Sequence, residues 1–214
     1  MKPKYTPEDL QEQNNFELLT EVSHQKLKEF VVQQISQEKR IIPLYSIYQL
    51  LMVLLFIFLL ARSVVLAIKG FDEPILFIGL AAVFSVSILI VIHELLHALA
   101  YLVTGARKIS FGAIPRKFIF YALADRQVIA PAAFRIVALA PFIIVKITCL
   151  IGVAIWFNQQ LMYSFLTVMC LHSLFCSGDI AMLAFYNIHK GKEIYNYDDK
   201  TEGKTYFYLR KPEY

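Results

Sequence analysis

The chain has 214 residues, of which 57% are hydrophobic and only 18% are charged. This balance is too apolar for an ordinary soluble domain and is typical of a small membrane protein with several spans. The formal net charge of +4 does not indicate a nucleic-acid partner, because basic loops beside membrane spans are expected on topological grounds.

Residues 1–40 are polar and of mixed charge, which predicts a cytosolic amphipathic helical segment and no cleavable signal peptide. Thr6, followed by a proline and two acids, is typical of a helix start. Phe16, Leu19 and Val22 begin an imperfect apolar stripe. We expect this segment to pack on the membrane domain or to lie on the lipid surface.

Residues 41–190 contain four apolar stretches, and each exceeds the ~20 residues that a helix needs to cross a bilayer. The stretches run over residues 43–68, 75–103, 134–157 and 161–188. The sequence therefore predicts an all-α membrane protein with about four transmembrane helices. A cytosolic tail over residues 191–214 follows this membrane domain.

Basic residues gather before the first stretch, between the second and third, and after the fourth. They are Lys26, Lys28, Lys39, Arg40, Arg107, Lys108, Arg116, Lys117, Arg126, Lys190 and Lys192. By the positive-inside rule, the long central connection and both termini lie in the cytosol. We therefore expect a multi-pass protein of the cell membrane with both termini cytoplasmic.

The connection between the second and third stretches has the composition of extended structure. Over residues 109–122, aromatic and β-branched residues are interrupted by Gly112 and Pro115, and residues 124–127 can supply a turn. A short β-hairpin and an ordinary cytosolic loop both fit this pattern, and a hairpin edge can bind an unwound substrate strand by β-addition. Residues 205–209 predict a further short strand, which can pair with the hairpin or bind a partner.

The second stretch carries the sequence His93-Glu94-Leu95-Leu96-His97 after eighteen residues without charge. Ionisable residues at membrane depth cost about 2.5–3.5 kcal/mol each on insertion scales, so their presence indicates a function. On a helix, residues i and i+4 lie on one face, so His93 and His97 can present two imidazole nitrogens to one cation. Glu94 lies one residue along, within reach of a water at the same metal. This is the H-E-x-x-H arrangement of zinc peptidases, with two ligands and one general base.

A catalytic zinc usually takes three protein ligands, so the chain must offer a third donor at the same depth. His93 and Asp179 each lie eighteen residues beyond the start of their stretch, at residues 75 and 161. At ~1.5 Å rise per residue, both therefore lie ~27 Å along their helices. Asp179 is the only acidic residue in the fourth stretch, and a metal would neutralise a carboxylate that lacks a basic partner there.

His172 and Cys176 are the competing donors. His172 lies seven residues before Asp179, which on a straight helix places it ~10 Å deeper in the membrane. We expect it to hydrogen-bond a ligand, to line the cavity, or to tie the fourth helix to a neighbour. Cys176 can coordinate zinc, but packing is the commoner fate of a buried cysteine. Arg135, at the start of the third stretch, can stabilise developing negative charge or anchor its helix at the membrane surface.

These features resemble a family of small bacterial membrane proteins described as zincin peptidases. The resemblance rests on residues 93–99, on Phe111-Gly112, on Arg135 before Ala140-Pro141-Phe142, and on Ser177-Gly178-Asp179-Ile180. The layout is also similar to that of the site-2 intramembrane metalloproteases, whose zinc ligands come from a span with His-Glu-x-x-His and a later span with an aspartate. The later span here reads Cys-Ser-Gly-Asp, where those proteases have a proline-rich stretch that ends in Asp-Gly. The resemblance implies cleavage of peptide bonds in or near the membrane.

The sequence thus predicts a membrane-embedded zinc metallopeptidase, with zinc held by His93, His97 and Asp179 and with Glu94 as the general base. Its partners would be membrane lipids and a membrane-associated protein or peptide substrate, with no nucleic acid. The alternative is a non-enzymatic membrane protein whose polar cluster binds or transports a metal ion or a proton. A polar contact between helices is a further alternative for the same residues.

Overall fold

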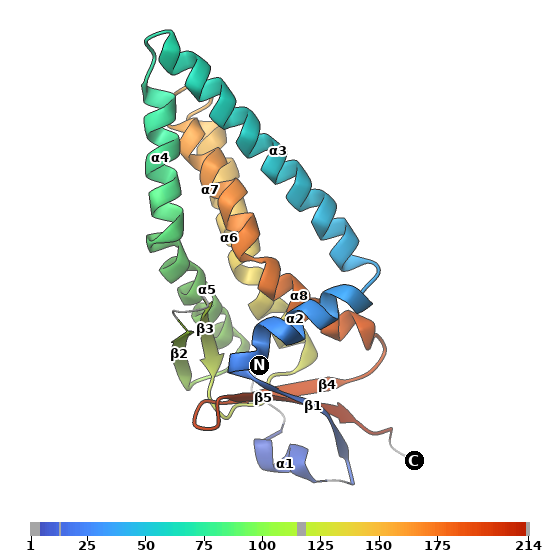
Figure 1. The fold of residues 1–214 in the computed structure, drawn as a ribbon. Helices are drawn as coiled ribbons and strands as arrows, with labels where there is room; N and C mark the ends of the chain where they lie inside the picture. The colour runs from blue at the N-terminus through green and yellow to red at the C-terminus, as the bar shows by residue number, and fades with distance from the viewer. Residues whose placement is uncertain (1–4, 13, 115–118, 213–214) are drawn as a thin grey trace.

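The structure, a computed structural model, describes residues 5–12, 14–114 and 119–212. Helices alone form one end of the molecule, and further helices and the strands form the other end (Figure 1). The helices of the first end are α3 (Ile41–Ile68), α4 (Glu73–Val86), α6 (Pro131–Ile155) and α7 (Met162–Phe175). The chain continues from α4 into α5 (Ile88–Thr104) and from α7 into α8 (Ser177–Ile188).

Two helices in the described part of the chain, α3 and α6, are long and apolar enough to cross a membrane by themselves. The helices of the pairs α4–α5 and α7–α8 are each too short to meet this criterion alone, and each pair meets it only when it counts as one span, with a bend of 48° or 46°. The prediction of about four spans is therefore replaced by two to four. Only 11% of the most apolar window of α3 is buried, so most of its apolar side chains face outwards, as contact with lipid requires.

Both bends lie shortly before candidate site residues. Ser87 is the C-cap residue of α4, and its Oγ donates a hydrogen bond to the carbonyl oxygen of Val83 at 2.6 Å. A serine that bonds back to the preceding turn in this way tends to bend a helix. α7 ends at Cys176, and α8 starts directly after it. Since His93 and Asp179 each follow a bend, helices α5 and α8 set the direction in which these side chains point.

The prediction of an all-α protein is wrong, because the described chain contains five strands in two antiparallel sheets. One sheet has the strand order β1 (Phe16–Ser23), β5 (Lys204–Arg210) and β4 (Ile194–Asp199). The other sheet is a hairpin of β2 (Ile109–Ile114) and β3 (Ile119–Ala124). Both sheets lie at the end of the molecule opposite the α3–α4 connection (Figure 1).

The N-terminal segment is helical only in part. Helix α1 (Pro7–Gln11) starts with a capping box, in which the side chains of Thr6 and Asp9 each accept a hydrogen bond from the other's backbone N–H group. The turn η1 (His24–Lys26) leads into α2 (Leu27–Gln37), which packs against α8.

Phe16, Leu19 and Val22, which begin the apolar stripe expected on a helix, lie on strand β1. Phe16 and Val22 are both buried there. Strand β1 pairs with β5 in a register that sets Phe16 opposite Arg210. Because this partner strand lies at the other end of the chain, the pattern of the N-terminal segment alone could not reveal the pairing.

The predicted hairpin between the second and third apolar stretches is confirmed by the antiparallel pairing of β2 and β3. Residues 115–118, which include Pro115, Arg116 and Lys117, lie outside the described residues. Residues 124–127, expected at the hairpin turn, come at the end of β3 and after it. The predicted tail strand is also present, but it pairs with β1 and β4 and not with the hairpin.

Candidate metal centre

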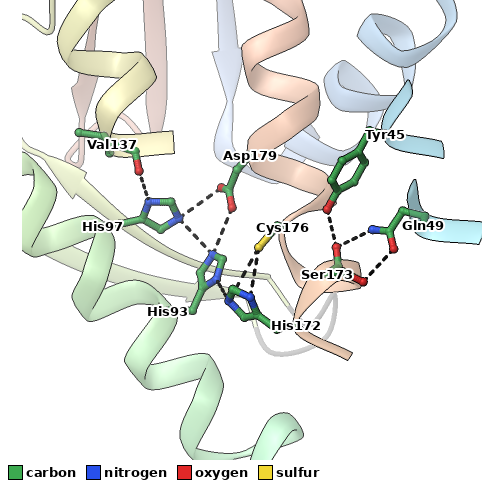
Figure 2. Close-up of polar contacts among 9 residues, drawn as sticks. All are labelled: Tyr45, Gln49, His93, His97, Val137, His172, Ser173, Cys176 and Asp179. Carbon is green, nitrogen blue, oxygen red and sulfur yellow. Dashed lines mark hydrogen bonds and ion pairs between the residues drawn. The ribbon is translucent and has the colours of Figure 1, made fainter. Parts of the chain in front are cut away.

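Two histidines of α5 meet on one helix face, as their i and i+4 spacing predicts. The Nε2 atoms of His93 and His97 lie 3.1 Å apart, and both residues are buried. Asp179, in the first turn of α8, completes the cluster (Figure 2). Its Oδ2 lies 3.2 Å from His93 Nε2, and its Oδ1 lies 3.3 Å from His97 Nε2.

The spacing of these three donors fits a metal ion. Zinc bonds of about 2.0–2.1 Å in a tetrahedral arrangement place neighbouring ligand atoms about 3.3 Å apart. The observed separations are 3.1, 3.2 and 3.3 Å. Asp179 Oδ2 is buried without a hydrogen bond, since its approach to His93 does not meet hydrogen-bond geometry. A cation between the three donors would satisfy this carboxylate oxygen.

The other ring nitrogens of both histidines have partners of their own (Figure 2). His97 Nδ1 donates to the carbonyl oxygen of Val137 on α6 at 3.0 Å, which leaves the lone pair on Nε2 free for a metal. His93 Nδ1 lies 3.1 Å from Nε2 of His172 on α7. When His93 donates in this contact, its proton is on Nδ1, and the lone pair on its Nε2 is also free for a metal. Partners of this kind fix the ring orientation of metal-binding histidines.

His172 and Cys176 form a second group of metal-type donors with His93. Cys176 Sγ lies 3.6 Å from His172 Nδ1, and neither residue is exposed. The predicted ~10 Å displacement of His172 from the cluster is wrong, because it assumed a straight fourth helix. The bend between α7 and α8 lies between His172 and Asp179, and His172 contacts the cluster directly.

Glu94 lies beside the cluster and belongs to neither group of donors in the described structure. Its Oε2 atom is buried and has no hydrogen-bond partner among the described residues. An unpaired carboxylate oxygen close to a metal site is available to accept a proton from water.

A cavity of about 670 Å³ is open to the cluster. Its wall contains His93, Glu94, His97 and Asp179, together with mostly apolar side chains. The volume is within the range of small-molecule pockets, roughly 300–1,000 Å³. Arg135 is exposed on α6 and is not among the described residues of the cavity wall, so the structure does not bring it to the cluster.

Sequence reasoning missed several groups that border the cluster. Tyr101 is buried in the cavity wall one turn of α5 after His97, and this i+4 spacing was a usable signal. Val137 contributes a backbone carbonyl, so its side chain gives no signal. The polar residues of β4 and β5 that face the cavity reach it through pairing of strands, which a local pattern does not reveal.

A comparison with models of protein families matches residues 86–195, which are 110 of the 214 residues. The matching family is described as "Putative zincin peptidase". The chain belongs to this family. The part that matches the zincin peptidase family contains Glu94 and both groups of candidate ligands. No curated protein and no solved structure matches the chain.

Proposed function

We propose that this protein is a membrane-embedded zinc metallopeptidase that hydrolyses peptide bonds in or near the membrane. The observation that carries the proposal is the convergence of His93, His97 and Asp179 at separations that suit a tetrahedral ion. Membership of the zincin peptidase family supports the same class of reaction.

The residues that would hold zinc are His93, His97 and Asp179. A catalytic zinc site keeps one position open, so its ligands must face a space that a substrate can enter. All three of these residues lie in the cavity wall, whereas His172 and Cys176 are not among its described residues. The donor set with Asp179 is therefore the one that suits catalysis, and His172 is left to orient His93 through the hydrogen bond between their rings.

Glu94 is the proposed general base. When bound, zinc supplies a Lewis acid that favours ionisation of water and polarises a carbonyl group. The unpaired Oε2 of Glu94 can take the proton of the attacking water and pass it to the leaving amine. The cavity gives water and a peptide access to this carboxylate.

We infer that an extended segment of a membrane-associated protein or peptide is the substrate. Residues 120–123 of β3 lie in the cavity wall, and β2 is the only strand that pairs with β3 among the described residues. The other edge of β3 can therefore bind an extended peptide by β-addition. The bent helix pairs and the outward-facing apolar side chains of α3 support a place in the cell membrane, in contact with lipids. The basic residues then favour an orientation with both termini cytoplasmic.

The test compares the wild-type protein with Glu94→Gln, both purified in detergent. Glu73→Gln is the matched control, because Glu73 is exposed at the start of α4. Zinc content and hydrolysis of peptides from membrane-protein sequences are measured for all three proteins. We expect Glu94→Gln to keep zinc and to lose hydrolysis, while Glu73→Gln keeps both. Full activity in Glu94→Gln contradicts the role of this residue. Zinc binding without hydrolysis in the wild type favours the alternative of a non-enzymatic protein that binds or transports an ion.

A further inference from the structure

Part of the cavity lining is a polar wall that the proposed mechanism does not use. It consists of four residues from η1, β4 and β5, which are His24, Asn196, Asp198 and Thr205. Each of them is at most 8% exposed. Polar side chains this deeply buried, and facing a mostly apolar cavity, ask for an explanation.

Asp198 is the charged centre of the polar wall. Thr205 Oγ1 donates to Asp198 Oδ1 at 2.5 Å, and His24 Nε2 lies 3.3 Å from the same hydroxyl oxygen and 3.8 Å from the carboxylate. Within the described residues, His24 is the only basic side chain that pairs with Asp198. Lys28 lies in the cavity wall but is exposed, and the described ion pairs of Asp198 do not include it.

The neighbouring Asp199 has a structural role in the same sheet, and it serves as a comparison for Asp198. Its Oδ1 accepts the backbone N–H groups of Thr201 and Glu202 and so closes the turn between β4 and β5. Asp199 is not among the described residues of the cavity wall. The described hydrogen bonds of Asp198 include none of this kind to the turn, and Asp198 lines the cavity.

Cavity-lining residues on one face of α5 lead from the candidate metal ligands towards the polar wall. His93, His97 and Tyr101 follow one another at intervals of four residues, each about 6 Å along the helix axis. Tyr101 lines the same cavity as Asp198, Asp179 and Glu94. One cavity of about 670 Å³ therefore contacts the candidate metal ligands, Tyr101 and Asp198, and this volume is large enough for a peptide side chain.

The two groups of polar residues in the cavity lining come from different parts of the chain. The metal cluster lies inside the range that matches the zincin peptidase family, residues 86–195. All four residues of the polar wall lie outside that range. The residues for the reaction and the residues of the polar wall are thus separate sets, as expected where the second set selects the substrate.

We propose that the polar wall is a specificity subsite that binds a lysine or arginine side chain of the peptide substrate at Asp198. This inference rests on the proposed function and names the substrate class. The long methylene stem of such a side chain fits the apolar part of the cavity, and its cationic end meets the buried carboxylate. A cation at this point also offsets the cost of keeping Asp198 away from water.

The test is a binding measurement on the zinc-loaded, full-length Glu94→Gln protein in detergent, so that peptides are not consumed. The probe is a short, fluorescein-labelled peptide of alanine and leucine in which one lysine is moved through every position. A second series carries norleucine in place of lysine, which keeps the methylene stem and removes the ammonium group. Binding is followed by fluorescence anisotropy. At one position of the series, we expect lysine to bind about ten- to a hundredfold more tightly than norleucine.

Asp198→Asn in the same background should remove this preference. Glu193→Gln should keep it, because Glu193 pairs with Arg210 on the same sheet and does not belong to the described cavity wall. Equal binding of lysine and norleucine at every position overturns the proposal, and this result does not depend on the folding of a wall variant. A preference that survives Asp198→Asn, with zinc content unchanged, overturns it as well.

Incubation of the same peptides with the wild-type protein separates this inference from the proposed function. A lysine preference without cleavage supports the subsite and contradicts peptide hydrolysis. Cleavage without a lysine preference supports hydrolysis and contradicts the subsite.

Discussion

Replacement of His172 by phenylalanine tests how the candidate metal ligand His93 is oriented. The variant keeps a ring of similar size at a position that is not exposed, and it removes the nitrogen that lies 3.1 Å from His93 Nδ1. Phenylalanine fills the space of the His172 ring, so no water can take the place of the lost nitrogen. The ring of His93 then has no partner at Nδ1 to fix its orientation. Loss of such an outer partner typically lowers metal affinity about 10–100-fold, which corresponds to about 1.4–2.7 kcal/mol.

The assay is competition between the protein and a chelator of known zinc affinity, followed by the zinc that remains on the protein. His189→Phe is the matched control, because Nδ1 of His189 donates to the carbonyl oxygen of Phe185 and the residue is not among those of the described cavity wall. We expect the control to bind zinc as the wild type does. Unchanged affinity in a folded His172→Phe protein refutes the orienting role. Complete loss of zinc in both His172→Phe and Cys176→Ser would instead assign the ion to the second group of donors.

Two further predictions concern stability. Gly152→Ala should lower the midpoint of thermal unfolding in detergent, because an added Cβ would lie 2.4 Å from the ring of Phe165. Such overpacking costs about 1–3 kcal/mol. Gly79→Ala is the control and should not lower the midpoint, because a Cβ there has no neighbour within 4 Å among the described residues. Burial alone would raise the pKa of Glu38, but hydrogen bonds from backbone N–H groups at the start of α3 and from Asn187 outweigh burial and hold this pKa below its usual value. The stabilisation of the folded state by Glu38 is therefore complete above the pKa that this residue has in the unfolded chain. It is lost as the pH falls through the lower pKa of the folded protein, so the midpoint of thermal unfolding should decrease in acid. Glu38→Gln should weaken this decrease, and an identical pH profile in the variant would contradict the reasoning.

The sequence predicted the parts of the fold that depend on local pattern. Helices α3 and α6 follow from long apolar runs, and the pairing of His93 with His97 follows from the helical repeat. The approach of Asp179 followed from its being the single acid of its apolar stretch. The bends did not follow, because they depend on a serine side chain and on packing around Cys176 and not on hydropathy.

The three-stranded sheet was beyond a sequence argument for a different reason. Its central strand, β5, pairs with β1 from the opposite end of the chain and with β4. The apolar residues of β1 fit an amphipathic helix about as well as a half-buried strand, and only the distant partner decides between them. The polar wall of the cavity depends on this sheet, so Asp198 and Thr205 could not be placed near the metal cluster in advance.

The most direct test of the central claim is the zinc content of the detergent-purified protein, measured by elemental mass spectrometry beside His97→Ala and Asp179→Ala. We predict a zinc ion bound to each wild-type chain and a loss of zinc in both variants. Loss of zinc in His97→Ala alone would indicate that the third ligand is His172 or Cys176 and not Asp179. A carefully prepared wild-type protein that binds no zinc would contradict the proposal of a zinc peptidase.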